Sequence, residues 1–116
     1  KKKGFEMTVR KNATILVEFF GGYPIIRVID FLLENRGFDY SKAEISKNAE
    51  IGTATLHQLW GKLEKFGIVK ETRKYGNTRL YMLNEENEFV KTLKTMVLKL
   101  AKEEFEKNAQ KRRVYA

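Results

Sequence analysis

The sequence predicts one mainly helical domain with a single small β-hairpin, an α+β fold that ends in a long C-terminal helix. Three observations lead to this fold class. Apolar residues recur every three or four positions through most of the 116-residue chain, which is the period of an amphipathic helix. Residues 68–73 and 78–83 have the composition of strands, and the Gly-Asn pair between them is typical of a tight hairpin turn. Residues 85–110 carry one long apolar stripe at helical spacing.

The first helices are predicted from caps and periodicity. Residues 1–11 have no periodicity and are interpreted as a basic arm. Asn12 is placed to cap a short helix over residues 13–20 that ends at Gly21-Gly22, although the β-branched residues there leave a strand as the alternative. Pro24 suits the first turn of the next helix, which extends to residue 35 on five regularly spaced apolar residues: Ile25, Val28, Ile29, Leu32 and Leu33. This helix is expected at the centre of the core.

Ser41 and Glu44 form a capping-box pattern, so a short helix is expected up to Ala49, followed by a tight break. A third helix is predicted over residues 53–66, with Trp60 on its buried face. The two helices are predicted to meet through the apolar residues Ile45, Ala49, Ile51 and Leu56.

The hairpin and the last helix complete the prediction. Gly76 and Asn77 are expected to supply the positive φ angles of the hairpin turn. Asn84 is expected to cap the final helix, with Glu85, Glu86 and Glu88 in its first turn and Lys111, Arg112 and Arg113 past its end. This order of charges suits the helix dipole.

Composition excludes several classes of function. Twenty-three Lys and Arg face 15 Asp and Glu, giving a net charge of +8, with one His and no Cys. Without Cys, the sequence excludes disulfides, thiol catalysis, zinc fingers and iron–sulfur clusters. One His leaves almost nothing for a catalytic imidazole or a metal site, so we expect no enzyme, no metal and no cofactor. The net charge points instead to a polyanion, either nucleic acid or an acidic membrane surface.

The positive charge is concentrated in two places. Residues 1–23 and 67–83 each have a net charge of +3, whereas residues 24–66 are neutral overall. Neither focus is an amphipathic helix with an apolar face free for lipid, and no apolar run approaches the ~18 residues of a spanning helix. We therefore expect a cytoplasmic, nucleoid-associated protein with no membrane partner.

The predicted order of short helix, tight turn, helix and hairpin is that of the winged helix-turn-helix. Three stretches carry a family resemblance: residues 44–59 (EISKNAEIGTATLHQL), residues 62–69 (KLEKFGIV) and residues 73–84 (RKYGNTRLYMLN). They resemble the winged helix-turn-helix transcription regulators of the broad MarR/ArsR type, and their pattern is most similar to small archaeal members. The resemblance covers about residues 24–84. We divide the chain into a basic N-terminal arm (1–11), a winged helix-turn-helix domain (12–84) and a long C-terminal helix (85–116).

The resemblance implies a sequence-specific regulator of transcription that binds double-stranded DNA. Its recognition helix, residues 53–66, would enter the major groove and contact bases through Thr53, Ala54, His57 and Gln58. The DNA backbone or minor groove would be contacted by residues at the helix start, on its side and in the wing at 70–79: Gly52, Thr55, Lys62, Arg73, Lys74, Tyr75, Asn77 and Arg79. Family members often carry Arg or Lys early in this helix. Here it is neutral, so the wing and arm are expected to supply much of the affinity.

The final helix predicts a homodimer. At 1.5 Å per residue, residues 85–110 would span about 39 Å, which is longer than a compact domain can cover. The predicted interface is its apolar stripe, formed by Phe89, Leu93, Met96, Val97 and Leu100, with residues 15–20 as a further contribution. The alternative is that the stripe folds onto its own domain and the end of the helix frays.

Two other functions stay open at this point. A DNA-coating protein with weak sequence preference, chromatin-like or plasmid-partitioning, is favoured by the neutral recognition helix. A winged-helix module that binds a protein partner is the other alternative, and the basic wing counts against it. Because the chain has one His and no Cys, the metal- and thiol-sensing branches of the family do not apply, and no small-molecule effector can be inferred.

Overall fold

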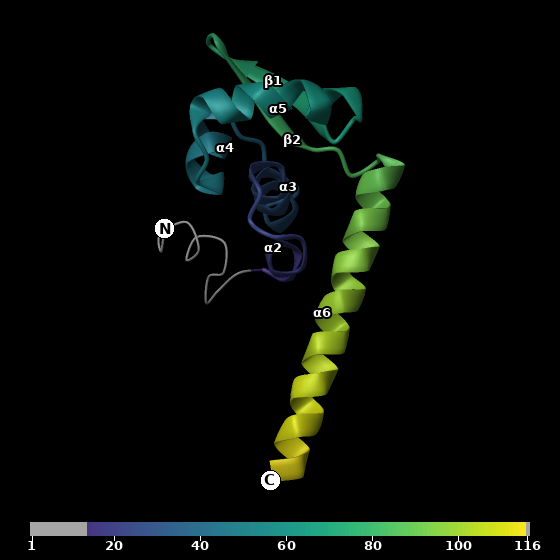
Figure 1. Cartoon of the computed structure of the whole chain (residues 1–116). Coiled ribbons are helices and arrows are strands. Elements are labelled where there is room, and N and C mark those ends of the chain that lie inside the picture. The colour runs from purple at the N-terminus through teal and green to yellow at the C-terminus, as the bar shows by residue number, and fades with distance from the viewer. Residues whose placement is uncertain (1–13, 116) are drawn as a thin grey trace.

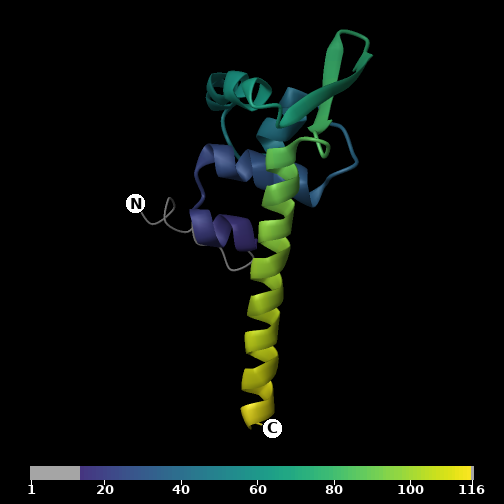
Figure 2. The same cartoon turned by 90° about the vertical axis from the view of Figure 1, so that its right-hand side faces the viewer.

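The computed structural model describes residues 14–115, with side chains as far as residue 109, so the arm at residues 1–11 lies outside it. The elements in chain order are α2 (Ile15–Phe20), α3 (Pro24–Glu34), α4 (Lys42–Ala49), α5 (Thr53–Lys65), β1 (Val69–Tyr75), β2 (Thr78–Leu83) and α6 (Glu88–Tyr115). Helices α3, α4 and α5 group below and beside the hairpin, while α6 runs past α3 and α2 and extends beyond them as a rod (Figures 1 and 2). No helix in this part of the chain combines the length and apolar character needed to cross a membrane.

Helix α2 confirms the helical prediction for this segment, and the strand alternative is wrong. The helix starts at Ile15, and Thr14 caps it in place of the predicted Asn12. The Thr14 hydroxyl accepts a hydrogen bond from the Val17 amide at 3.3 Å and donates one to Asp30 Oδ1 at 2.7 Å. A hydroxyl can do both at once, so the same residue caps α2 and ties it to α3. Leu16 is buried in the core, which a helix permits on one face.

The core lies between the apolar faces of α3, α4 and α5 and the inner ends of the two strands. Its most deeply buried side chains are Leu16, Val28, Leu32, Ile45, Leu56, Leu63, Leu83 and Val90. Trp60 is buried as predicted, and its ring packs edge-on against Tyr81 with 4.9 Å between the ring centroids. Residues from each of the described helices and from both strands therefore contribute to one cluster.

The helix-turn-helix follows the predicted pattern closely. Ser41 and Glu44 form the complete capping box at the start of α4. The turn after α4 begins at Glu50, which has a left-handed backbone (φ 60°) and whose carbonyl accepts a hydrogen bond from the Arg27 guanidinium at 3.0 Å. Helix α5 ends at Lys65, with Phe66 as its C-cap, one residue earlier than predicted.

The hairpin is longer and tighter than predicted. β1 runs to Tyr75, so the turn contains only Gly76 and Asn77. Gly76 has a positive φ of 63° but Asn77 does not, which corrects the expectation that both would. A positive φ at the first central residue alone is the pattern of a type II′ turn. The pairing also has a β-bulge between Glu71 and Arg73.

The start of α6 corrects the predicted cap. The helix begins at Glu88, and Asn87 caps it by accepting a hydrogen bond from the Val90 amide at 3.0 Å. Asn84 instead accepts from the Glu86 amide and donates to the Gly67 carbonyl, so it shapes the turn before the helix. Glu85 and Glu86 consequently lie outside α6. Its other end reaches Tyr115, which places Lys111, Arg112 and Arg113 inside the helix and not past its end.

Candidate nucleic-acid interface

The four residues predicted to contact bases lie on the outer surface of α5. Thr53, Ala54, His57 and Gln58 are all exposed. The opposite face of α5 is held in the core by Leu56, Trp60 and Leu63. Because an α-helix turns about 100° per residue, Ala54 and Gln58 stand one above the other and His57 lies beside them. The structure thus brings these four residues together on one open face.

The first turn of α5 is electrostatically suited to an anion. Gly52 is the N-cap and has no side chain to bond the first amide groups, and no acidic residue lies in the first turn. The amide groups at the start of the helix therefore keep their hydrogen-bonding capacity, and the positive end of the helix dipole is not neutralised within the turn. Thr55 is half-buried beside Gly52, with its Oγ1 3.8 Å from the position that a Cβ on Gly52 would take.

The hairpin projects at the same end of the molecule as α5. Figures 1 and 2 show both elements at the end opposite to the C-terminus of α6. Residues 71–79 are all exposed. The tip presents Lys74, Tyr75 and Asn77, and Tyr75 is 76% exposed. The exposed face of α5 and the basic hairpin therefore lie at one end of the molecule (Figures 1 and 2).

The fold is similar to that of a solved structure. The structure of a double mutant of ZitR from Lactococcus lactis aligns with a TM-score of 0.55 and 16% sequence identity, over 73% of this chain and 60% of that chain. This chain therefore spans less than two thirds of that ZitR chain. The chain has a winged helix-turn-helix fold.

A possible transcriptional regulator from Methanosarcina mazei Go1 also aligns, with a TM-score of 0.47 and 13% identity, over 76% of this chain and 73% of that one. No protein-family model matches the sequence. No curated protein matches it either. In the winged helix-turn-helix fold, α4 and α5 form the helix-turn-helix and the β1–β2 hairpin is the wing.

The four basic residues of the wing differ in what they contact. Arg79 pairs with Glu71 of the facing strand at 3.2 Å, and both side chains are largely exposed. Arg73 pairs with Asp39, outside the wing, through two hydrogen bonds of 2.9 and 3.2 Å. Lys70 and Lys74 form no ion pair with any residue in the range 14–109. Of the three basic wing residues predicted to contact DNA (Arg73, Lys74 and Arg79), Lys74 is thus the one without an ion pair to an acidic residue in that range.

Asp39 is held in its charged form. The hydrogen bond from Arg73, followed by the one from Thr72, lowers the pKa of the Asp39 carboxyl below its ordinary value. The same contact raises the pKa of Arg73. The two groups therefore favour each other's ionised state.

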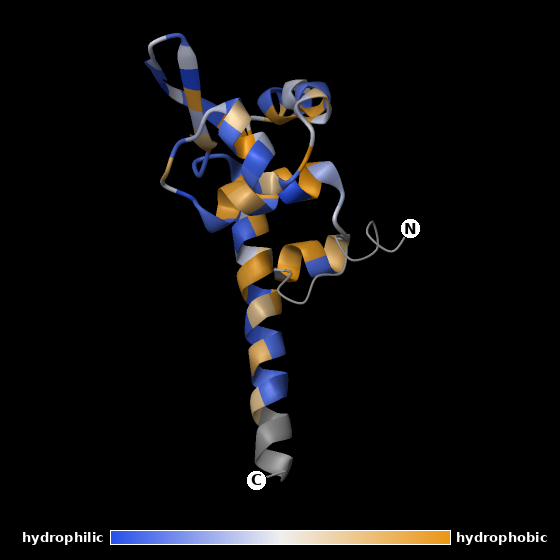
Figure 3. Cartoon of the chain, turned by 90° about the vertical axis from the view of Figure 1, so that its left-hand side faces the viewer, coloured by the Kyte–Doolittle hydropathy of each residue, from blue (hydrophilic) through white to orange (hydrophobic). Residues whose placement is uncertain are grey.

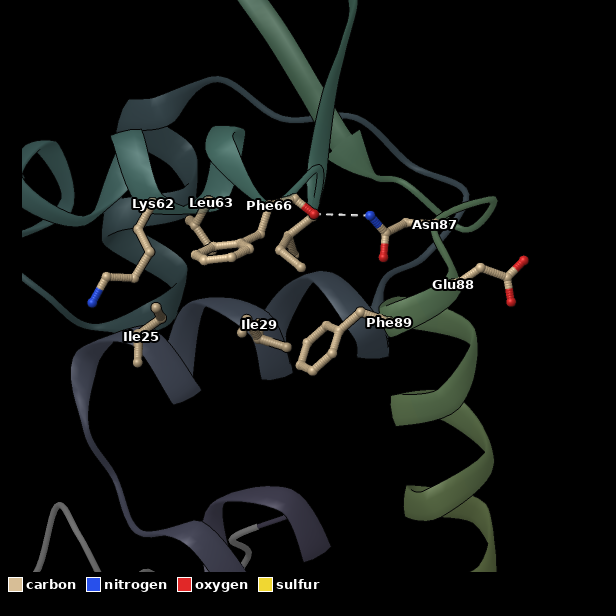
Figure 4. Close-up of a pocket in the computed structure, with 9 residues that line it drawn as sticks. Ile25, Ile29, Lys62, Leu63, Phe66, Asn87, Glu88 and Phe89 are labelled. Atoms are coloured by element: carbon tan, nitrogen blue, oxygen red, sulfur yellow. Dashed lines mark hydrogen bonds between the residues drawn. The ribbon is translucent and has the colours of Figure 1, made fainter.

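Lys62, another residue predicted to contact phosphate, is exposed and borders an apolar pocket. Its side chain runs toward Ile25 and lines an apolar pocket of about 530 Å³ between α3, α5 and the start of α6 (Figure 4). The aliphatic part of a lysine side chain readily covers apolar surface. The amide of Asn87 donates a hydrogen bond to the Phe66 carbonyl at the pocket edge (Figure 4). The other apolar residues around this pocket are Ile29, Leu63, Phe66, Ile68 and Phe89.

Lys65 is a basic residue of this surface that was not predicted from the sequence. This exposed lysine lies seven residues after Gln58, two helical turns along the same outer face of α5. Helical spacing alone would identify it, but the predicted contacts were limited to the first turns of the helix and to Lys62. The outer face of α5 therefore combines uncharged side chains at its start with the positive charge of Lys65 at its end.

The five residues of the predicted dimer stripe divide into two groups. Leu93 and Val97 are half-buried and pack against the core of their own domain. Phe89 is 57% exposed, and Met96 and Leu100 are half-buried. Apolar surface on α2 lies beside the apolar bands of α6 (Figure 3), and Phe19 and Phe20 of α2 pack edge-to-face on each other while remaining exposed.

Proposed function

We propose that this protein is a sequence-specific regulator of transcription that binds double-stranded DNA as a homodimer. Its α5 would enter the major groove, and its wing would contact the backbone or the minor groove. The observation that carries the proposal is that α5 and the wing lie at one end of the molecule (Figures 1 and 2): α5 has an exposed start without a side-chain cap, and the wing is a projecting hairpin with a basic tip. No acidic residue of α5 lies in its first turn, so DNA phosphates can approach without repulsion from it.

Sequence reading falls to the uncharged side chains of α5. Gln58 can form two hydrogen bonds with adenine, His57 can donate to N7 or O6 of guanine, and Ala54 can touch a thymine methyl group. Thr53 stands at the helix start, where its hydroxyl can bond a base edge or a phosphate. Each good two-bond contact discriminates by about 1–3 kcal/mol against the wrong base, so a small number of contacts gives moderate specificity.

Backbone contacts hold the complex together. The free amide groups after Gly52 suit one phosphate, and Lys74 and Tyr75 at the wing tip reach outward from the domain. Lys65 adds a positive charge on the outer face of α5. Arg79 can exchange its exposed partner Glu71 for a phosphate at little cost, because surface ion pairs contribute little free energy.

The proposed homodimer follows from the exposed second half of α6. Residues 101–108 are all exposed, yet a helical segment shorter than about 12–15 residues is marginal in water without tertiary contacts. A second copy that packs against Met96 and Leu100 would bury the half-covered side of the helix and continue onto Phe19 and Phe20 of α2. Two α5 helices related by a two-fold axis would then read half-sites about 34–36 Å apart.

Selection of bound duplexes from a random pool tests this function directly. We expect an enriched palindrome-like sequence, and we expect Gln58→Ala to relax the preference at one base position in each half-site. Glu103→Ala, an exposed residue on α6, is the matched control and should leave the selected sequence unchanged. A pool in which no sequence is enriched would contradict sequence-specific regulation.

A DNA-coating protein with weak sequence preference is the second candidate. The observation in its favour is that the outer face of α5 bears no arginine, the side chain that most often reads guanine. A nuclease footprint that spreads along the duplex as protein is added would support coating, whereas a footprint confined to one site would support the regulator. Either role places the protein with DNA in the nucleoid and requires no cofactor.

A further inference from the structure

Few side chains of the wing are buried against the rest of the domain. Val69 is the one buried residue of β1, and β2 is buried only at Tyr81 and Leu83 near its end. A two-stranded hairpin is at best marginally stable in water. A defined angle between the exposed half of the hairpin and α5 therefore requires contacts with residues outside the hairpin.

A β-bulge turns two adjacent side chains of β1 toward the same carboxylate. Glu71 pairs with Tyr81 and Arg73 with Leu80, which leaves Thr72 without a partner in the register. Neighbouring side chains of a regular strand point to opposite faces, but a bulge changes the direction of the side chains next to it. Here Thr72 and Arg73 both reach Asp39.

Three hydrogen bonds converge on Asp39. The Thr72 hydroxyl donates to Oδ2 at 2.6 Å. The Arg73 guanidinium donates from Nε to Oδ2 at 2.9 Å and from Nη2 to Oδ1 at 3.2 Å. This two-point contact fixes both distance and orientation, which a single charged contact does not. The Asp39 side chain is only 17% exposed, although that of Arg73 is 65% exposed.

Asp39 stands on a segment that is joined to the core. The next residue, Tyr40, exchanges two backbone hydrogen bonds of 2.8 Å with Tyr81. The Tyr40 ring packs on Phe31 of α3, and the Tyr81 ring packs on Trp60 of α5. The carboxylate is therefore a fixed point relative to the recognition helix.

We propose that Asp39 and Arg73 form a strut that sets the angle of the wing relative to α5, and that Arg73 is a positioning residue and makes no contact with DNA. Wing contact with phosphate then falls to Lys74, with Arg79 beyond it. This inference rests on the proposed function, and it departs from the sequence-based expectation that Arg73 and Lys74 act alike.

Electrostatics explain why Arg73 stays with Asp39 in the complex. If the guanidinium moved to a phosphate, it would leave a carboxylate unpaired on the surface that faces a polyanion. The Glu71–Arg79 pair differs in the carboxylate that would be left behind: the Glu71 side chain is 41% exposed, so water can solvate it, whereas that of Asp39 is 17% exposed. Among the ion pairs of residues 14–109, Arg73–Asp39 is the one that joins the wing to another part of the domain.

The first test measures the order of the wing in the free full-length protein. Heteronuclear NOE values for residues 74–79 are compared between wild type, Asp39→Asn, Arg73→Gln and the neighbouring control Lys74→Gln. We expect both strut variants to lower the NOE values of the tip, and the control to match wild type. Unchanged values in both strut variants would overturn the strut.

The second test measures the salt dependence of binding to a mixed-sequence duplex of about 30 base pairs, long enough for two half-sites. Lys74→Gln should make the plot of log K against log salt shallower by about 0.9 for each phosphate that the protein no longer neutralises. Arg73→Gln should leave that slope at the wild-type value. Asp39→Asn frees the guanidinium and should steepen the slope by up to the same amount.

An Arg73→Gln slope as shallow as that of Lys74→Gln would overturn the proposal, because Arg73 would then contact phosphate. If wild-type protein fails to bind any duplex, the proposed function fails. The NOE comparison still decides whether Asp39 and Arg73 hold the wing, so the two failures are distinguishable.

Discussion

Gly67, between α5 and β1, is the glycine at which we expect an added methyl group to cost most. Its φ of 69° lies in the left-handed region, and a Cβ built there would lie 2.8 Å from Asn87 Nδ2. Asn87 is the cap of α6 and also donates to the Phe66 carbonyl at 2.8 Å. Gly67→Ala therefore strains the backbone and displaces the side chain that joins α5 to α6.

The cost can be estimated from these contacts. A non-glycine residue in the left-handed region costs about 1–2 kcal/mol. Loss of the Asn87 cap costs about 1 kcal/mol, and loss of its hydrogen bond to Phe66 about 1 kcal/mol more. The total of about 3–4 kcal/mol is a large part of the roughly 5–15 kcal/mol that stabilises a domain, and it should lower Tm by roughly 15–20 °C.

Thermal and urea unfolding followed by circular dichroism measure this effect. All variants are compared at one protein concentration, because the proposed dimerisation would make Tm depend on concentration. Gly61→Ala is the matched control: Gly61 lies within α5, and nothing stands within 4 Å of a Cβ there. Alanine is a better helix former than glycine, so Gly61→Ala should raise stability by about 0.5–1 kcal/mol.

A double-mutant cycle with Asn87→Ala separates the steric part from the backbone part. With Asn87 shortened, Gly67→Ala should cost only its left-handed strain of about 1–2 kcal/mol, so the two changes should be less than additive by about 1 kcal/mol or more. Equal costs of Gly67→Ala in both backgrounds would refute the reasoning, as would a cost in wild type no larger than that of a surface substitution.

The remaining predictions concern pH and assembly. The contacts of Asp39 lower the pKa of its carboxyl below the ordinary value of 3.8. The carboxyl therefore stabilises the fold at pH values above 3.8, and this stability is lost as the pH falls through the folded pKa. In urea unfolding at a series of pH values, the loss should be smaller for Asp39→Asn. Burial raises the pKa of Asp30, so the pH dependence of stability has the opposite sign at this carboxyl. Its stabilising contribution is present at low pH and is lost as the pH rises. Asp30→Asn should therefore stabilise the protein at pH 7. Wild-type protein is expected to sediment as the proposed dimer and Leu100→Glu as a monomer, and an unchanged mass for this variant would exclude Leu100 from the interface.

Local sequence patterns predicted most of the fold. The capping box at Ser41 and Glu44, the apolar spacing in α3 and α5, and the exposed position of Gln58 follow from interactions within one helical turn or from helical periodicity. Such interactions are the same wherever the helix lies, so they can be read before the tertiary structure is known. The neutral outer face at the start of α5 follows from the same periodicity.

Caps at ambiguous positions required the tertiary structure. Asn84 and Asn87 both precede the last helix, and either side chain can cap one. The choice depends on contacts with the segment that follows α5. Asn84 donates a hydrogen bond to the Gly67 carbonyl and Asn87 donates one to the Phe66 carbonyl, and with the chain held in this way Asn87 is the residue at the start of the helix. The surroundings of Lys62 also required the tertiary structure, because residues of α3 and α6 help to form the apolar pocket beside it.

By itself, the sequence determined which segments are helical, where the hairpin turns, and that positive charge lies in the wing and not early in α5. Only the tertiary structure decided what that charge contacts. Arg73 and Asp39 are 34 residues apart, and the β-bulge that aims Arg73 at Asp39 depends on strand pairing that no local pattern encodes. Charge can be counted along a chain, but the groups that neutralise it are set by packing between distant segments.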